Sequence, residues 1–366
     1  MSAPTWSGLL TRLLAGENLD RADTEWVMDR VMSGESSDVQ LAAFTVALRA
    51  KGETPDEVAG LVAAMLAHAV RVEVPGRTVD IVGTGGDRAN TVNISTMAAV
   101  VMAGAGATVV KHGNRAATSK CGAADLLEGL GVAISLTAPQ VARTAAETGI
   151  GFCFAPVYHP SFRYAGAVRR ELAVPTVFNF LGPLTNPAQP AAGAIGCGNP
   201  AMAPVMAQVF ADRGADVLVF RGDDGLDELT TTTTSTIWRV RAGGVERLTF
   251  DPAELGIAPA DPAALRGGEV ARNVQVARDL FAGQRSPVRD AVVLNAAAGL
   301  AAHAGLSGDL TADLAAGVQR AQDALDTGAA ARVLDRWVEL GRELTEPQLI
   351  ELGEQSESVA DSRGLR

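Results

Sequence analysis

The chain has 366 residues, of which 47% are hydrophobic and 20% charged, and its formal net charge is −11 at pH 7. This length is enough for two domains and the hydrophobic content is ample for a core, so we exclude a disordered chain. The acidic balance argues against nucleic acid or an anionic membrane surface as a partner, because both bind clustered positive charge.

The three cysteines give no sign of a disulfide framework or a zinc site. Cys121, Cys153 and Cys197 are far apart and share no CxxC spacing. We therefore expect a reducing compartment, the cytoplasm. The N-terminus lacks a basic start followed by an apolar run, and apolar helical stretches such as 58–70 are too short to span a bilayer. We expect neither a secretory nor a membrane segment.

Residues 1–72 read only as helices and predict a small α-helical domain. Apolar residues recur at helical spacing near the N-terminus: Trp6, Leu9, Leu10, Leu13 and Leu14. Ser37 precedes a second helical run, over 39–51. Thr54 and Pro55 then open a further helix with a cap and a first-turn proline.

From Thr78 onward short β-branched runs alternate with helical ones, which predicts an α/β fold with a central, mostly parallel sheet flanked by helices. The candidate strands are 79–82, 107–110, 132–136, 151–154, 191–196, 217–221 and 236–240. Thr230 to Thr234 is interpreted as an edge strand or its loop. The segment 162–188 interrupts the alternation and is expected to join the small domain, which leaves 73–161 and 189–366 as the large domain.

The run Val79 to Val82 ends in Gly83-Thr84-Gly85-Gly86-Asp87, a loop rich in backbone N–H groups and poor in side chains. A tight turn alone could explain a glycine cluster. The buried strand before it and the hydroxyl-rich helix start after it favour a phosphate-binding loop instead. That helix start is Asn93-Ile94-Ser95-Thr96, which precedes an apolar helix over 97–104 and predicts a second anion site at a positive helix end.

The strand 107–110 leads into Lys111-His112-Gly113-Asn114-Arg115, which carries two fixed cations. Lys111 and Arg115 could be surface charges, but their place at the end of a buried strand favours ligand binding. His112 either hydrogen-bonds a backbone carbonyl or accepts a proton. Asn114 offers a donor and an acceptor and so can orient a substrate. Together these loops predict a heavily phosphorylated small-molecule ligand.

Asp227 and Glu228 follow the strand 217–221 and a glycine turn. Loop carboxylates are usually only solvated, but the nearby phosphate loops change this interpretation. Two carboxylates and the Ser95 hydroxyl are hard oxygen ligands that suit Mg²⁺, which keeps several waters and shares its other positions with substrate oxygens.

The motifs GTGGD, NIST and KHGNRA, in this order, resemble those of the anthranilate phosphoribosyltransferases, the second enzymes of tryptophan biosynthesis. The likeness continues in VRRELAVPTVFNFLGPLTNPA at 168–188, GLDEL at 225–229 and RDAVVLNAAAGL at 289–300. The resemblance implies transfer of the phosphoribosyl group of 5-phosphoribosyl 1-diphosphate to the amine of anthranilate, giving N-(5-phosphoribosyl)anthranilate and pyrophosphate. It also implies two Mg²⁺ ions, a discontinuous small domain, a cleft between the domains and a homodimer.

By motif position, the resemblance assigns roles to individual residues. The phosphoribosyl-diphosphate contacts are Gly83, Gly86, Asp87, Thr91, Asn93, Ile94, Ser95, Thr96, Lys111, Asn114, Arg115, Ser119 and Ala123. The anthranilate contacts are Gly83, Asn114 and Arg169, the catalytic groups His112, Asn114 and Arg169, and the metal ligands Ser95, Asp227 and Glu228. A guanidinium can meet the carboxylate of anthranilate in two parallel hydrogen bonds, although Arg169 alone reads as an exposed helix cation and Arg170 is its competitor.

No motif signals covalent catalysis, so positioning, metal-assisted departure of pyrophosphate and electrostatic stabilisation of an oxocarbenium-like state are expected to supply the rate. Cys121 and Ala123 stand where the family commonly has serines, and Pro175 where it often has arginine. A related transferase with another aromatic amine acceptor therefore stays open. A pyrimidine-nucleoside-phosphorylase-like enzyme is a second alternative, which has no need of the acidic pair as metal ligands.

Overall fold

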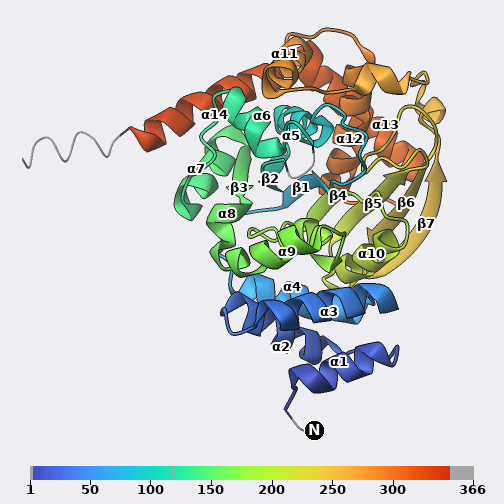
Figure 1. Ribbon diagram of the computed structural model, residues 1–366. Helices are drawn as coiled ribbons and strands as arrows, with labels where there is room; N and C mark the ends of the chain where they lie inside the picture. The colour runs from blue at the N-terminus through green and yellow to red at the C-terminus, as the bar shows by residue number, and fades with distance from the viewer. Residues whose placement is uncertain (1–2, 117–118, 347–366) are drawn as a thin grey trace, which may run out of the picture.

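The computed structural model describes residues 3–116 and 119–346. Helices of the N-terminal part lie beneath an α/β body built on one seven-stranded sheet (Figure 1). The strands are β1 (Thr78–Gly83), β2 (Thr108–Gly113), β3 (Ile150–Phe154), β4 (Ala192–Gly196), β5 (Asp216–Gly222), β6 (Ser235–Arg241) and β7 (Gly244–Phe250). Their order across the sheet is β3-β2-β1-β4-β5-β6-β7.

The first four helices are α1 (Trp6–Leu14), α2 (Arg21–Met32), α3 (Asp38–Lys51) and α4 (Pro55–Ala67). The helices of the body are α5 (Ile94–Gly104), α6 (Ala123–Gly129), α7 (Ala138–Thr148), α10 (Met202–Asp212), α11 (Val270–Phe281), α12 (Pro287–Ala304), α13 (Leu310–Asp326) and α14 (Ala329–Thr345). Between β3 and β4 lie α8 (Ala155–Tyr158), η1 (Pro160–Ala165), α9 (Gly166–Leu172), η2 (Val177–Asn179) and η3 (Gly182–Leu184), and the turns η4 (Pro252–Leu255) and η5 (Pro262–Leu265) precede α11.

The prediction of a mostly parallel sheet is confirmed. Strands β1 to β5 pair in parallel, whereas β6 and β7 pair antiparallel at one edge. Each strand except β7 was expected from its β-branched run. β7 was missed, and it is the exposed edge strand that follows β6 through a tight turn at Ala242 and Gly243, both with φ in the left-handed region.

One expectation about a strand needs correction. Residues 132–136 form a loop between α6 and α7 and not a strand. Their alternating apolar side chains are buried, and Ala133 packs closely against Gly341 of α14, so the alternation reflects packing of a loop on the core. Of the two interpretations given for Thr230 to Thr234, an edge strand or its loop, the structure shows the loop that leads into β6. Its hydroxyls bond acids: Thr230 Oγ1 donates to Asp224 Oδ2 at 2.7 Å.

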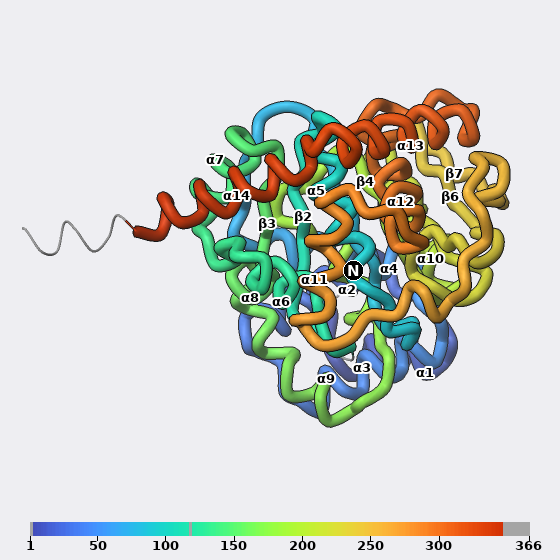
Figure 2. Tube along the Cα trace, turned by 90° about the horizontal axis from the view of Figure 1, so that it is seen from above, coloured from blue at the N-terminus to red at the C-terminus, as the bar shows by residue number. Residues whose placement is uncertain are grey.

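The two faces of the sheet bury alternate side chains of each strand. In β5, Leu218 and Phe220 join the core beneath α5, α12, α13 and α14, whereas Val217 and Val219 join the core that includes α10 and the N-terminal helices. Figure 2 shows α5, α12, α13 and α14 on the near side of the sheet, with the N-terminal helices on the far side. None of the helices in the described residues is both long and apolar enough to cross a membrane.

The segment 160–184 packs with the N-terminal helices, since Ala165, Val168 and Phe178 lie in the same hydrophobic cluster as residues of α1 to α4. This cluster also contains Val219 of β5, so the helical part and the body share a continuous core. The division into domains with boundaries at 72, 161 and 188 stays a prediction.

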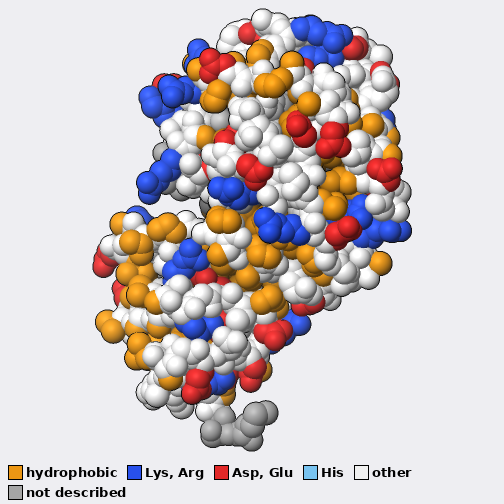
Figure 3. Space-filling view, turned by 90° about the vertical axis from the view of Figure 1, so that its right-hand side faces the viewer, with side chains coloured by type: hydrophobic (Ala, Val, Ile, Leu, Met, Phe, Trp, Pro, Cys, Tyr) orange, Lys and Arg blue, Asp and Glu red, His pale blue; other side chains and the backbone are white. Residues whose placement is uncertain are grey.

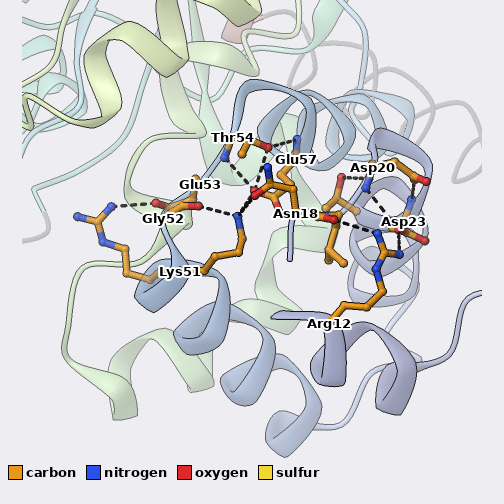
Figure 4. Close-up of polar contacts among 12 residues, drawn as sticks. Arg12, Asn18, Asp20, Asp23, Lys51, Gly52, Glu53, Thr54 and Glu57 are labelled. Atoms are coloured by element: carbon orange, nitrogen blue, oxygen red, sulfur yellow. Dashed lines mark hydrogen bonds and ion pairs between the residues drawn. The ribbon is translucent and has the colours of Figure 1, made fainter. Parts of the chain in front are cut away.

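A buried polar cluster fixes the N-terminal helices relative to one another (Figure 4). Glu57 of α4 is fully buried and accepts hydrogen bonds from the N–H groups of Leu19 and Thr54 at 2.9 and 2.8 Å. Lys51 Nζ pairs with the same carboxylate at 2.9 Å. Because a buried carboxylate is stable only when its partners surround it, these contacts hold the loop before α2 and the loop before α4 in one arrangement.

Candidate active site

The predicted phosphate loop follows β1, at the sheet edge where the parallel strands end, which is the usual ligand site of such sheets. Gly85 and Gly86 have φ values of 70° and 82°, and a Cβ at either position would meet nothing within 4 Å. Arg88 and Asn90 also take positive φ, at 64° and 52°. The loop is therefore left-handed at four positions and open beside its glycines, so that a ligand can reach its backbone.

The acidic pair closes onto this loop from the segment after β5. The Gly85 N–H group donates to Asp227 Oδ2 at 2.6 Å. A Cβ on Gly83 would lie 2.2 Å from Asp227 Oδ2, and one on Gly196 only 1.6 Å from the Asp227 carbonyl oxygen. Glycine at both positions is thus required for the acidic pair to reach the phosphate loop.

Three carboxylates gather here and oppose one another's ionisation. Burial, followed by the charge of Asp87, raises the pKa of Asp227 to about 7. Burial and the charge of Asp227 raise the pKa of Glu228 well above its ordinary value, although Lys111 acts in the opposite direction. A site that concentrates buried carboxylates in this way is suited to a divalent cation.

The oxygen ligands available here suit Mg²⁺ better than a metal ion that is coordinated by protein side chains alone. Within residues 3–116 and 119–346, no group of three His, Cys, Asp or Glu side chains is arranged to hold a metal alone. Mg²⁺ is commonly bound through one or two carboxylates, water and substrate phosphate, so a partial set of hard oxygens is what it requires. Asp227, Glu228 and the half-buried Ser95 offer that partial set.

The second predicted anion site is the N-terminus of α5, which begins at Ile94 instead of the expected 97. Asn93 precedes the helix without capping it. Its Nδ2 donates instead to the Cys121 carbonyl at 2.9 Å, and its Oδ1 accepts from Asn273 Nδ2 at 2.8 Å. The Ile94 and Thr96 side chains are buried, so these two residues can meet a phosphate only through their backbone. Thr91 is half-buried and its backbone bridges to Arg266.

The two predicted phosphate cations occupy different environments. Lys111 is buried, and its Nζ donates to the Ile81 carbonyl at 2.5 Å. Burial lowers the pKa of Lys111, opposed by the charges of Asp80 and Glu228. Lys111 lies within β2, whereas the sequence placed it directly after the strand. A contact from Lys111 to the diphosphate stays a prediction.

Arg115 lies on the exposed loop after β2 and pairs with acids of α6. Its guanidinium contacts Asp125 at 2.8 Å and Glu128 at 2.9 Å. These two partners raise its pKa. A phosphate contact from Arg115, which also stays a prediction, requires exchange of these carboxylates for the ligand.

The other predicted residues of this loop surround its tip. The Oδ1 of Asn114 accepts from the Arg115 N–H group at 2.7 Å, and the exposed Ser119 donates to the Cys121 carbonyl at 3.4 Å. A Cβ on Gly113 would lie 3.2 Å from the Ala123 Cβ, so Ala123 packs directly against the loop.

His112 at the end of β2 is buried and neutral near pH 7. Its Nδ1 donates to the Gly182 carbonyl at 3.0 Å, while its buried Nε2 has no hydrogen-bond partner among the described residues. Burial, together with His159, lowers its pKa to about 3. The two rings lie 5.2 Å apart between centroids. The sequence did not single out His159, although its position soon after a predicted strand was a usable signal.

The guanidinium of Arg169 in α9 makes cation–π contacts with two aromatic rings. It lies over the rings of Phe162 and Phe178, at 5.0 and 5.8 Å from their centroids, and burial lowers its pKa. It forms no ion pair with a described residue, whereas its neighbour Arg170 is exposed. Figure 3 shows an indentation between the body and the helical part with Lys and Arg side chains along its upper side. Arg169 is thus better prepared than Arg170 to meet a carboxylate, and its contact with anthranilate stays a prediction.

Comparison with known proteins matches nearly the whole described chain. Residues 75–331 match the model of the glycosyl transferase family a/b domain, and residues 7–69 match the helical bundle domain of that family. An anthranilate phosphoribosyltransferase from Thermobifida fusca is 60% identical over 339 residues, covering 93% of this chain and 97% of that protein. One from Salinispora arenicola is 58% identical, with 93% and 98% covered.

Solved structures agree with the sequence comparison. The anthranilate phosphoribosyltransferase of Thermus thermophilus is 40% identical with a TM-score of 0.85, covering 91% of this chain and 99% of that one. The enzyme from Saccharomyces cerevisiae in complex with PRPP and Mg has a TM-score of 0.83 and covers 92% and 98%, but at 24% identity it shows likeness of fold alone.

Proposed function

The chain belongs to the anthranilate phosphoribosyltransferase family, and from this membership we propose that it transfers the phosphoribosyl group of 5-phosphoribosyl 1-diphosphate to the amine of anthranilate. The products are N-(5-phosphoribosyl)anthranilate and pyrophosphate, in the second step of tryptophan biosynthesis from chorismate. The observation that carries the proposal is the contact of Asp227 Oδ2 with the Gly85 N–H group, which brings a buried acidic pair onto a glycine-rich phosphate loop.

The loop after β1 and the N-terminus of α5 bind the diphosphate substrate in this proposal. Their backbone N–H groups surround phosphate oxygens, and the open space beside Gly85 and Gly86 admits the ligand. Ser95, Asp227 and Glu228 hold the Mg²⁺ ions, two in number. When bound, Mg²⁺ neutralises charge that develops on the departing pyrophosphate. A fold relative from yeast has PRPP and Mg bound, which supports this use of the metal.

The acceptor lies on the other side of the cleft in this proposal, where Arg169 binds the carboxylate of anthranilate. The guanidinium already lies over the rings of Phe162 and Phe178. Because its position is restricted before the acceptor binds, little side-chain entropy is lost on binding. The amine of anthranilate is a weak base and attacks as a neutral group. Asn114 orients it. A hydrogen bond from the amine to His112 Nε2, which is buried and has no partner in the described part of the chain, requires this atom to become accessible when the acceptor binds.

The active unit that we propose is a cytoplasmic homodimer joined through α1 and α3. Leu14 and Val39 have exposed fractions of 80% and 78%, and Val46 on the same helix as Val39 has 45%. Hydrophobic side chains line one side of the helical part in Figure 3. An exposed apolar surface of this kind is typical of an interface between copies of a chain. Three free cysteines fit a reducing cytoplasm.

The fluorescence of anthranilate gives a direct test. We expect the signal to fall when 5-phosphoribosyl 1-diphosphate and Mg²⁺ are added together, and the fall to stop when EDTA is added. Anthranilate that survives, with protein that still binds the diphosphate, would point to a different aromatic amine acceptor and to the departures at Ala123 and Pro175. Consumption that persists in EDTA would contradict the metal assignment.

A further inference from the structure

The helical part and the body meet where the chain passes between them near residues 70, 159 and 185. The Val70 N–H group donates to the Tyr158 carbonyl at 2.9 Å, so two of these passages are joined directly. The third passage, which contains η3 and ends at Asn186, is held by side chains of the sheet.

Asn186 is the centre of these contacts. Its Nδ2 donates to Asp80 Oδ2 and to the Val110 carbonyl, both at 2.8 Å. Its Oδ1 accepts from the Ala188 N–H group at 2.9 Å. Asn186 is 4% exposed and Asp80 3%, so water is excluded from the pair and each polar atom depends on its protein partner.

Two histidines extend the same connection. The second oxygen of Asp80 accepts from the His112 N–H group at 3.3 Å, and the His112 ring donates to the Gly182 carbonyl at 3.0 Å. His159 Nε2 donates to the Thr185 carbonyl at 2.9 Å. Side chains from β1, from β2 and from the residue after α8 thus hold the segment 182–186 at three points.

This segment lies between the two halves of the proposed site. Just before it is η2 with Phe178, whose ring supports Arg169. On the other side, β1 and β2 end in the loops that carry the proposed diphosphate contacts. The separation between acceptor and diphosphate therefore depends on how the segment is attached to Asp80 and Val110.

We propose that Asp80 and Asn186 are positioning residues, whose buried contact sets the location of the acceptor-binding Phe178 and Arg169 relative to the diphosphate loops. The inference rests on the proposed function for the identity of the two substrates. A hydrophobic pair would pack here without a desolvation penalty, but it would not fix one geometry as directional hydrogen bonds do. Burial raises the pKa of Asp80 to about 6, a sign of that penalty.

The test compares Asn186→Asp with an exchanged double variant, Asp80→Asn with Asn186→Asp. The single variant places two carboxylates together, whereas the double variant restores an amide–carboxylate contact with the donor reversed. The control is Asp23→Asn in the helical part (Figure 4), which alters a buried acid paired with Arg12 at 2.5 Å. KM for both substrates, kcat and melting temperature are measured for each.

For Asn186→Asp we expect the KM for anthranilate to rise roughly tenfold or more, because the donations to Asp80 and to the Val110 carbonyl are both lost, with the KM for the diphosphate changed less than about twofold. The exchanged variant should recover part of the lost affinity, because the amide–carboxylate contact returns but the new carboxylate at position 186 cannot donate to the Val110 carbonyl. Asp23→Asn should lower the melting temperature without changing either KM. Equal changes in both KM values, or a lower melting temperature with neither KM changed, would overturn the positioning role.

Hydrogen–deuterium exchange supplies a readout that needs no turnover. In Asn186→Asp, peptides that cover α9 and η2 should exchange faster than in the wild type, and those of α2 should not. Unchanged exchange in α9 and η2 would overturn the proposal even in an active enzyme. Asn186→Ser, which removes the amide without adding charge, is measured in the same way if Asn186→Asp does not fold. If the wild-type protein shows no turnover, the proposed function is refuted, and the exchange experiment still tests the positioning role of Asp80 and Asn186.

Discussion

Asp227→Asn should make the metal-free protein more stable while removing its response to Mg²⁺. The wild-type carboxylate is buried and its pKa is raised from 3.8 to about 7. A rise of this size corresponds to roughly 4 kcal/mol of unfolding free energy lost when the group is ionised. Asparagine avoids that loss, and its Oδ1 can still accept from the Gly85 N–H group. Since a neutral acceptor is weaker by about 1 kcal/mol, we expect a net gain of about 3 kcal/mol.

The gain must depend on pH in a definite direction. Because the folded protein binds this proton more tightly than the unfolded chain, rising pH destabilises the wild type from about pH 4 to about pH 7, and the loss is constant above that. The amide of the Asp227→Asn variant does not titrate, so the difference between variant and wild type should grow over the same window. Urea unfolding in EDTA at pH 5 and pH 8 measures it, with Asp216→Asn as control. That substitution removes a surface pair with Arg77 and should give a small loss at both pH values.

Mg²⁺ should reverse the order of stability. At about a hundred times its Kd, a ligand that binds only the folded state adds roughly 2.7 kcal/mol, and the wild type should gain on this scale. Asp227→Asn should gain little, and Asp227→Asn combined with Glu228→Gln should also lose turnover by on the order of a hundredfold or more. A variant that is no more stable than the wild type in EDTA at pH 8, or that keeps the full Mg²⁺ effect, would refute the reasoning.

Arg169→Ala should raise the KM for anthranilate and leave that for the diphosphate nearly unchanged in steady-state kinetics, while Arg170→Ala should change neither; a dominant loss of diphosphate affinity would assign Arg169 to the wrong substrate. Ala173 ends α9 with φ of 51°, a conformation that favours glycine, so Ala173→Gly should raise the unfolding free energy in urea by about 1 kcal/mol, and no gain would show that the turn is unstrained. Val39→Glu should convert the dimer to monomer in sedimentation experiments, whereas Val245→Glu on β7 should not; a wild-type monomer would remove the dimer proposal.

The sequence could predict the strands that end in the site, because each is a short β-branched run that stops at glycine or a turn. It could not place β7, since an edge strand with one exposed face lacks a continuous apolar run. The turn at Ala242 and Gly243 was nevertheless a hairpin signal. The prediction of a strand over 132–136 was wrong because a buried loop and a strand can show the same alternation of apolar residues. Only their packing partners distinguish the two.

The sequence predicted which loops meet at the candidate site. It predicted less well whether individual side chains in those loops are buried or exposed. Gly83, Gly85 and Asp227 come together as expected, because parallel strands end at one edge of the sheet. Lys111 was expected at the end of a buried strand; its side chain is buried, with its Nζ on the Ile81 carbonyl, and its contact with the diphosphate stays a prediction. Whether a residue near the end of a strand faces ligand or core depends on its neighbours' register, which a single sequence does not contain.

The contact between Asp80 and Asn186 illustrates the same limit, and also a signal that could reduce it. The register of β1 and β2 aligns Val79 with Val109, so Asp80 falls opposite Val110 and on the sheet face away from α5. An acid inside an otherwise apolar parallel strand is costly unless a partner covers it, so Asp80 alone indicates a polar element packed on that face. The partner is 106 residues away and only the fold identifies it. In this chain the buried acid of a strand is therefore as informative as the exposed loops, because it marks where the two halves of the site are joined.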